Sequence, residues 1–191
     1  PDFTDPATCD NEFLLQSSLW ACMLGERRGS YEFDEYGRMV IPAADVDAQA
    51  VSLFGQNIKL EHMTIGDMEN AYQYDSDIAS YHVPIIAMTG FATPSVEKIV
   101  MKQDSCQLTV GYVPPTTVLS INYDSKGNLE ETPSKYMLYE LRKNGKDFYL
   151  YSVTTIMNDS VSGTEFNTGT VGRVDTLTSS DSQGGGNTQA P

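Results

Sequence analysis

The chain has 191 residues, of which 40% are hydrophobic, and this is enough for one domain of ordinary size. Its formal net charge of −14 argues against a nucleic-acid-binding role, because contacts to phosphates need a surface rich in Lys and Arg. No segment approaches the ~18 uninterrupted apolar residues of a membrane-spanning helix, so we expect no span within this chain. The sequence leaves open an anchor upstream of Pro1.

The acidic residues are concentrated in the N-terminal half. Residues 1–80 hold 15 acidic and 4 basic residues, whereas residues 81–191 hold 11 and 8. Such a surface usually serves solubility, and its alternative role is the attraction of a cationic partner or Ca²⁺. The EF-hand pattern is absent, so the sequence predicts no calcium site of that kind.

Two helices are predicted in the first 55 residues. Apolar residues at helical spacing predict a helix over residues 7–24, with Asp5 and Pro6 suited to its start and Gly25 to its end. A shorter helix is predicted from about residue 44 to residue 54. The glycine that follows each helix is a common terminator.

Hairpins and connections are predicted between these helices and residue 94. Residues 30–41 and 71–83 each hold two short strand-like runs around a turn, and each predicts a hairpin. Residues 58–65 are predicted as a further strand. The stretch 84–94 contains Gly and Pro but is otherwise apolar, and we interpret it as a partly buried connection.

Alternation of apolar and polar residues dominates the chain from residue 95 to residue 156. Period-two alternation bounded by Gly, Asn, Asp and Pro is typical of an antiparallel meander with one buried face. The predicted strands are residues 96–101, 106–112, 118–123, 136–143 and 148–155.

These elements predict an α+β fold, in which the N-terminal helix packs on a curved antiparallel sheet and the region 30–84 adds extra hairpins. Residues 1–157 are predicted as a single domain. Residues 158–191 are rich in Ser, Thr, Gly and Asn, and this composition predicts a flexible tail or linker.

The sequence contains no motif that carries chemistry. His62 and His82 are the only imidazole bases, and neither has a nucleophile signature beside it. Cys9, Cys22 and Cys106 allow one disulfide with a free thiol, or ordinary core residues. Their spacing from the histidines does not suit zinc, and there is no phosphate-binding loop. We therefore predict no catalytic residues, no metal site and no cofactor.

Aromatic residues are dense in the predicted meander. Simple alternation places Tyr149, Tyr151 and Val153 on one face of the last strand, and Phe148 and Leu150 on the other. A sheet that is apolar on one side only does not need aromatics on both faces. The second face is therefore expected to be covered by a helix, to line a pocket, to meet a partner, or to hold cross-strand tyrosine pairs.

The layout resembles the NTF2-like/cystatin-like α+β group. The residues that carry this resemblance form the segment Lys135 to Val153, with its strand, Asn-Gly turn, aromatic and strand. Phrases such as Ile41-Pro42-Ala43-Ala44-Asp45-Val46 and Tyr81-His82-Val83-Pro84 are similar to those of uncharacterised, membrane-tethered or lipoprotein-like proteins of Gram-positive gut bacteria. The resemblance covers residues 7–156 and implies an extracytoplasmic or cell-surface location.

The leading hypothesis is a non-enzymatic extracytoplasmic domain that binds a protein or a small ligand through an aromatic sheet face or the 84–94 loop. The alternative is a hydrolase or small-molecule enzyme that uses a concave sheet pocket, with His62 or His82 and a carboxylate as acid and base. A third hypothesis is a structural spacer of a cell-surface protein. The residues predicted for ligand or partner binding are Tyr81, His82, Phe91, Tyr112, Tyr149 and Tyr151.

Overall fold

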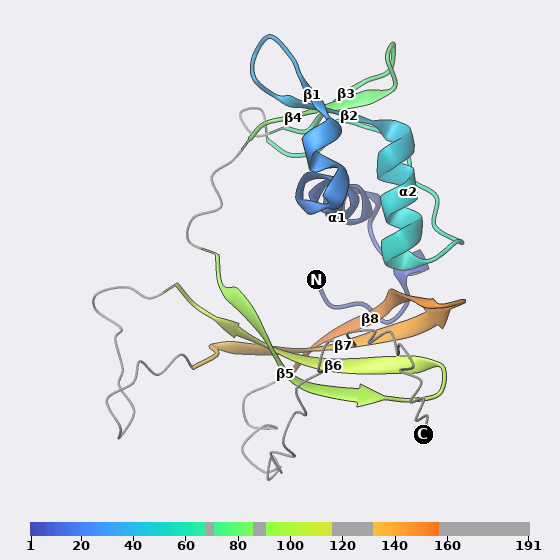
Figure 1. Cartoon of the computed structure of the whole chain (residues 1–191), viewed down its shortest axis with the longest axis vertical. Coiled ribbons are helices and arrows are strands. Elements are labelled where there is room, and N and C mark those ends of the chain that lie inside the picture. The colour runs from blue at the N-terminus through green and yellow to red at the C-terminus, as the bar shows by residue number, and fades with distance from the viewer. Residues whose placement is uncertain (68–70, 86–90, 116–131, 157–191) are drawn as a thin grey trace, which may run out of the picture.

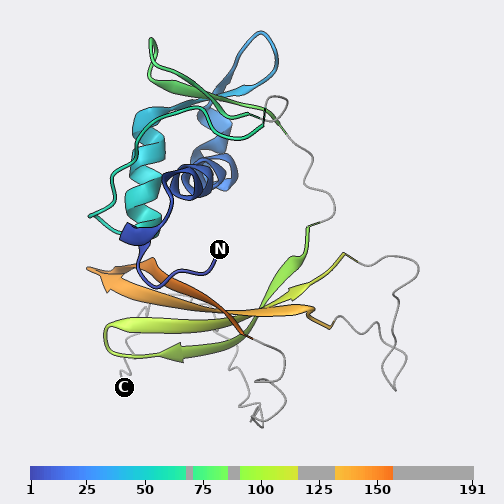
Figure 2. The same ribbon diagram turned by 180° about the vertical axis from the view of Figure 1, so that it is seen from behind.

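The computed structural model describes residues 1–67, 71–85, 91–115 and 132–156 (Figure 1). Within these residues, two α-helices and two four-stranded antiparallel sheets form an α+β fold, as the sequence predicts. The helices lie between the two sheets, and the views from both sides agree on this arrangement (Figure 2). The strand predicted over 118–123 and the tail predicted over 158–191 lie outside the described residues.

The helical layer begins later than the sequence predicts. The predicted start of the first helix, at residue 7, is wrong. The helix begins after Asp10, whose side chain caps it by accepting a hydrogen bond from the backbone N–H of Glu12. Asp5 instead caps a separate 3₁₀ turn. The bounds are η1 Pro6–Thr8, α1 Asn11–Leu24, η2 Glu26–Ser30 and α2 Ala43–Phe54. Both α-helices end at the predicted glycines.

The first sheet is built from the two predicted hairpins, both of which are confirmed. Its strands run in the order β1-β2-β4-β3. Their bounds are β1 Glu32–Phe33, β2 Met39–Pro42, β3 Gln73–Asp75 and β4 Ser80–Val83. Pairing of β2 with β4 joins the hairpins into one sheet, which a sequence pattern cannot predict because the two strands are far apart in the chain.

The strand predicted over residues 58–65 is wrong. Only Ile65 pairs there, in an isolated bridge with Tyr72. The side chain of Asn11 on α1 bonds both the N–H and the C=O of Glu61. The backbone groups of Glu61 are therefore satisfied by a helix side chain rather than by a neighbouring strand.

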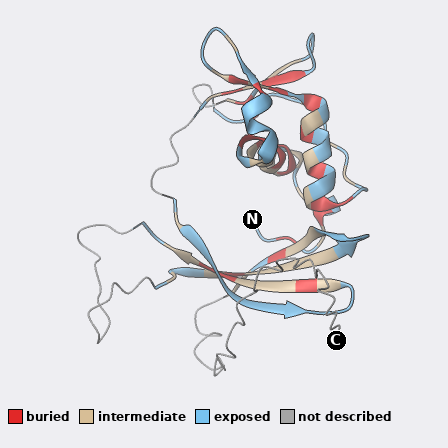
Figure 3. Cartoon of the chain, in the orientation of Figure 1, coloured by how far each residue is buried: buried red, intermediate tan, exposed pale blue. Residues whose placement is uncertain are grey.

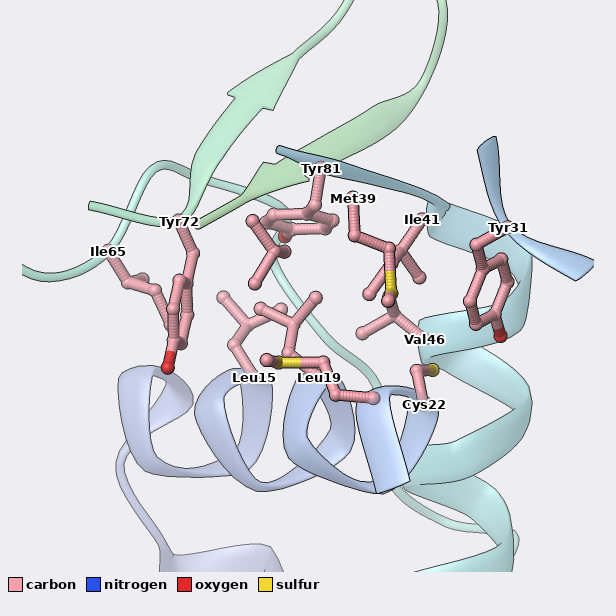
Figure 4. Packing of buried hydrophobic residues seen from close by; sticks show 12 residues of the cluster. Leu15, Leu19, Cys22, Tyr31, Met39, Ile41, Val46, Ile65, Tyr72 and Tyr81 are labelled. Carbon is pink, nitrogen blue, oxygen red and sulfur yellow. The ribbon is translucent and has the colours of Figure 1, made fainter. Parts of the chain in front are cut away.

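One face of the first sheet packs on α1 and α2 to form the main core (Figure 4). Leu15 and Leu19 on α1 meet Ile41 on β2 and Tyr81 on β4, and all four are fully buried. Cys22 is also buried in this core. Cys9, Cys22 and Cys106 are free thiols in the structure.

The second sheet is the predicted meander, with strands in the order β5-β6-β7-β8. The bounds are β5 Thr93–Met101, β6 Ser105–Val113, β7 Lys135–Asn144 and β8 Asp147–Ile156. Gly145 takes φ +65° in the tight turn between β7 and β8, a conformation that favours glycine.

A β-bulge in β8 corrects the predicted alternation of its side chains. Glu140 pairs with Ser152 and Leu141 pairs with Leu150, so Tyr151 is the extra residue. Leu150 and Val153 therefore share one face, although simple alternation places them on opposite faces. Phe148 pairs with Lys143 and shares the face of Leu150, whereas Tyr149 pairs with Arg142 on the other face, so aromatic residues do lie on both faces of this strand.

The meander joins the helical layer through a second apolar cluster. Phe3, Leu14 and Phe54 pack there against Met137 and Val153. Phe3 also forms a backbone bridge with Val153, so the N-terminal segment pairs with the outer edge of β8. This contact covers the β7–β8 side of the sheet, whereas β5 on the far side is exposed along its whole length (Figure 3).

Candidate functional site

A surface groove of about 510 Å³ lies between the C-terminal end of α2 and the β7–β8 hairpin. Residues 5–7, 54–58 and 142–144 line it, together with Tyr149 and Tyr151. Both tyrosines are among the residues that the sequence singles out for binding. A ligand in the groove can therefore contact the aromatic residues of the meander.

The chemistry of this groove differs from that of the whole protein. Its charged lining residues are Asp5, Arg142 and Lys143, so the groove is locally cationic in a chain of net charge −14. Gln56 and Asn57 add side-chain amides, which both donate and accept hydrogen bonds. This combination suits a polar ligand that carries negative charge.

The guanidinium of Arg142 lies over an aromatic ring. Its guanidinium carbon lies 3.1 Å from the centre of the Tyr151 ring, and its Nε lies 3.4 Å from a carboxylate oxygen of Glu140. The N–H groups of a guanidinium lie in its own plane. A guanidinium that stacks on a ring can therefore still donate along its edge to a planar anion. The Arg142 side chain is 43% exposed and lines the groove, so a ligand in the groove can reach it.

Gly55 brings the end of α2 close to the hairpin. Its φ of +93° closes the helix, and a Cβ at this position would lie 3.1 Å from the Tyr149 ring. The absence of a side chain therefore allows the helix end to contact the flat face of Tyr149. This contact fixes one wall of the groove against the other.

The sequence analysis missed Arg142, Gln56 and Asn57. A signal for Arg142 was present, because the predicted hairpin with its tight turn places Arg142 directly opposite Tyr149. No sequence signal identifies Gln56 or Asn57. They reach the groove only because α2 ends above the meander.

The other residues predicted for binding lie elsewhere. Tyr81 is fully buried in the core of the first sheet, and His82 points to the opposite face of the same strand. Phe91 is exposed just before β5. Tyr112 on β6 bonds the hydroxyl of Tyr139, and burial raises the pKa of Tyr139. The structure brings Tyr149 and Tyr151 together but not the remaining four.

His82 forms a hydrogen bond with a carboxylate, as the enzyme hypothesis requires. Its Nδ1 lies 2.8 Å from Oδ2 of Asp34, and the same carboxylate accepts from the Arg38 side chain. Another pocket, about 470 Å³ around Phe3 and Phe13, includes neither histidine, and neither does the groove. The His82–Asp34 pair thus ties the two hairpins of the first sheet together, outside the groove and outside the pocket at Phe3 and Phe13.

The environment of Asp34 favours its charged form. Burial acts against the charge, but hydrogen bonds from the Arg38 backbone, from His82, from the Arg38 side chain and from the Tyr36 backbone together hold its pKa well below the usual value. A carboxylate whose pKa is lowered in the folded state stabilises the fold above its unfolded pKa. This stabilisation is lost as the pH falls towards the folded pKa.

We therefore expect Asp34→Asn to reduce the dependence of stability on pH. The unfolded pKa of Asp is about 4, so the stability lost by the variant should be largest near neutral pH and should shrink as the pH falls below about 4. Urea denaturation across this range measures it. Asp77→Asn, in the exposed turn of the other hairpin, is the control, and equal pH slopes for wild type and Asp34→Asn would contradict the expectation.

His62 forms a second polar network, at the boundary of the main core. Its Nδ1 lies 3.0 Å from the hydroxyl of Tyr81, its Nε2 lies 3.3 Å from Asp47, and its ring stacks on Tyr74. Burial raises the pKa of Tyr81 to about 12, so this hydroxyl stays protonated at neutral pH. The network attaches the segment that carries His62 to the first sheet.

No group of three or more His, Cys, Asp or Glu side chains within the described residues could hold a metal ion. In the same part of the chain, each helix is too short or too polar to cross a membrane. Comparisons with protein-family models, with curated proteins and with solved structures found no match. Membership of the NTF2-like/cystatin-like group therefore stays a prediction.

Proposed function

We propose that this domain is a non-enzymatic binding module, and that a carboxylate-bearing ligand occupies the groove between α2 and the β7–β8 hairpin. The observation that carries the proposal is the Arg142 guanidinium over the Tyr151 ring, in a side chain that lines the groove and is 43% exposed. Charge-assisted, bidentate bonds between guanidinium and carboxylate are stronger than neutral hydrogen bonds. Tyr149 supplies a second aromatic wall.

The geometry favours binding over acid–base catalysis. A catalytic pair has to face a site where a substrate can lie. The Asp34 carboxylate already accepts four hydrogen bonds from its own hairpin and from His82, and His62 is tied to Tyr81 and Asp47. These contacts give both histidines a role in joining segments of the first sheet.

We propose an extracytoplasmic location for the binding module, on the basis of the sequence resemblance described above. Fractionation of cells that express the full-length protein measures this location directly. Recovery in the cytoplasmic fraction would contradict the proposed location and would leave the binding proposal to be tested separately.

The binding proposal is tested with two probes of the same shape, benzoate and its neutral isostere benzamide. We expect benzoate to shift the backbone amide NMR signals of residues 55–57 and 142–151, with benzamide binding much more weakly. Arg142→Gln should weaken benzoate binding by about tenfold or more, because a charge-assisted hydrogen bond contributes about 1.5–3 kcal/mol. The double variant Tyr149→Ala/Tyr151→Ala should also lose binding while remaining folded.

The matched control for this experiment is Arg28→Gln. Arg28 is exposed in η2 and is not among the residues that line the groove, so its removal changes the net charge equally without changing the site. Equal affinity for benzoate and benzamide would contradict the proposal. Unchanged benzoate affinity in Arg142→Gln would contradict it as well.

A further inference from the structure

The edge strand β5 carries the most exposed apolar side chains of the meander. Val96, Ile99 and Met101 are 55%, 60% and 62% exposed. Within the described residues, β5 pairs with β6 on one side, and all nine of its residues are exposed. Open sheet edges with exposed apolar residues are places where another strand can add to a sheet.

The backbone of β5 presents its outward groups at fixed positions. The carbonyl of Tyr112 accepts from Ser134, so the backbone groups of Tyr112 point towards β7 and away from β5. By the alternation of an antiparallel ladder, the β5 residues opposite Tyr112, Val110, Leu108 and Cys106 direct their own backbone groups outward. These outward residues are Pro94, Val96, Ile99 and Met101.

A β-bulge at Glu97 sets which side chains share a face. Val96 pairs with Val110 and Lys98 pairs with Thr109, so Glu97 is the extra residue. Because of this extra residue, Val96 and Ile99 lie on the same face of the sheet although three positions separate them. Lys98 lies on the opposite face, and so does Glu97, whose carboxylate reaches over Gly111.

These positions make β5 complementary to itself. When two copies of β5 run antiparallel about an axis between residues 97 and 98, Val96 of one copy faces Ile99 of the other. In the same register Pro94 faces Met101. The backbone groups that point outward from one copy then meet those that point outward from the other, and the apolar side chains of the two copies meet on one face. Glu97 then faces Lys98 of the second copy, twice, because the axis repeats the pair.

We propose that β5 pairs with β5 of a second copy of this chain in this register and joins two meanders into one continuous sheet. Pro94 removes one outward donor, and the charged residues at the bulge disfavour strands that do not complement them. The same features fit a second copy, because its Lys98 and Glu97 neutralise the charges. This edge lies on the opposite side of the meander from the groove, so the two proposals are independent.

Analytical ultracentrifugation from micromolar to millimolar concentration tests the proposal. We expect a monomer–dimer equilibrium in the wild type. Glu97→Lys and Lys98→Glu each place like charges opposite one another twice, so each should raise the dimer dissociation constant by about tenfold or more. The double variant Glu97→Lys/Lys98→Glu should recover the wild-type value, and a mixture of the two single variants should form a heterodimer.

General charge repulsion predicts a different pattern. Glu97→Lys reduces the net negative charge, so repulsion alone would predict tighter association, whereas the proposed register predicts weaker association. Lys59→Glu, in an exposed loop, is the control for a change of charge elsewhere. A monomer at every concentration would overturn the proposal. A dimer whose stability is insensitive to the single variants, or is not restored in the double variant, would overturn it as well.

Discussion

We expect Phe54→Ala to reduce the free energy of unfolding by about 3–5 kcal/mol, the range typical of Phe-to-Ala changes in a core. Phe54 is 4% exposed, and its ring lies 6.4 Å from the ring of Phe3 and 6.0 Å from that of Phe13. It also belongs to the cluster that contains Met137 and Val153 of the meander. The substitution therefore removes packing between the helical layer and the second sheet.

Urea denaturation followed by the fluorescence of Trp20 on α1 measures this loss. Leu24→Ala is the matched control, because Leu24 ends α1 and is 60% exposed. Its stability should change by no more than about 0.5 kcal/mol. Equal losses in the two variants would show that the junction contributes little to the fold.

We expect a comparable loss, about 3–5 kcal/mol, when Tyr81 is replaced by Ala. Tyr81 is fully buried among Leu15, Leu19 and Ile41, so removal of its ring leaves a cavity in the main core (Figure 4). Tyr81→Phe keeps the ring and removes only the hydroxyl that bonds His62. That variant should lose only about 1 kcal/mol, the usual net contribution of one hydrogen bond.

The comparison of the two Tyr81 variants separates packing from the polar network. Denaturation curves for wild type, Tyr81→Phe and Tyr81→Ala, measured under the same conditions, give both differences. If Tyr81→Phe were as unstable as Tyr81→Ala, the hydroxyl network through His62 would hold the first sheet together more than the ring does. The binding of benzoate should be the same in wild type and Tyr81→Phe, because Tyr81 does not line the groove.

Much of the local structure could be predicted from the sequence. Turn chemistry identified both hairpins of the first sheet and the β7–β8 hairpin, and Gly55 marked the end of α2. These signals are local, because a glycine or an Asp side chain acts on backbone groups within a few residues. The start of α1 was wrong for the same local reason, since a second capping residue, Asp10, lies inside the predicted helix.

The sequence could not predict which residues form the candidate site. Tyr149 and Tyr151 were singled out as aromatics of the meander, together with four residues that the structure places elsewhere. A strand pattern gives the face on which a side chain lies only while alternation is unbroken, and the bulge at Tyr151 breaks it. Gln56 and Asn57 join the groove through packing of α2 on β8, a contact between segments far apart in the chain.

The sequence by itself determined the α+β class, the meander and the tight turn that joins β7 to β8. These features depend on alternation and turn residues, which act within one strand or one hairpin. Only the tertiary structure decided that the hairpins of residues 30–83 form a sheet of their own, and that Arg142 stacks beside Tyr149 in a groove under α2. Those outcomes depend on the burial of apolar faces between segments that are far apart in the chain. A local sequence pattern does not show which of these segments pack together.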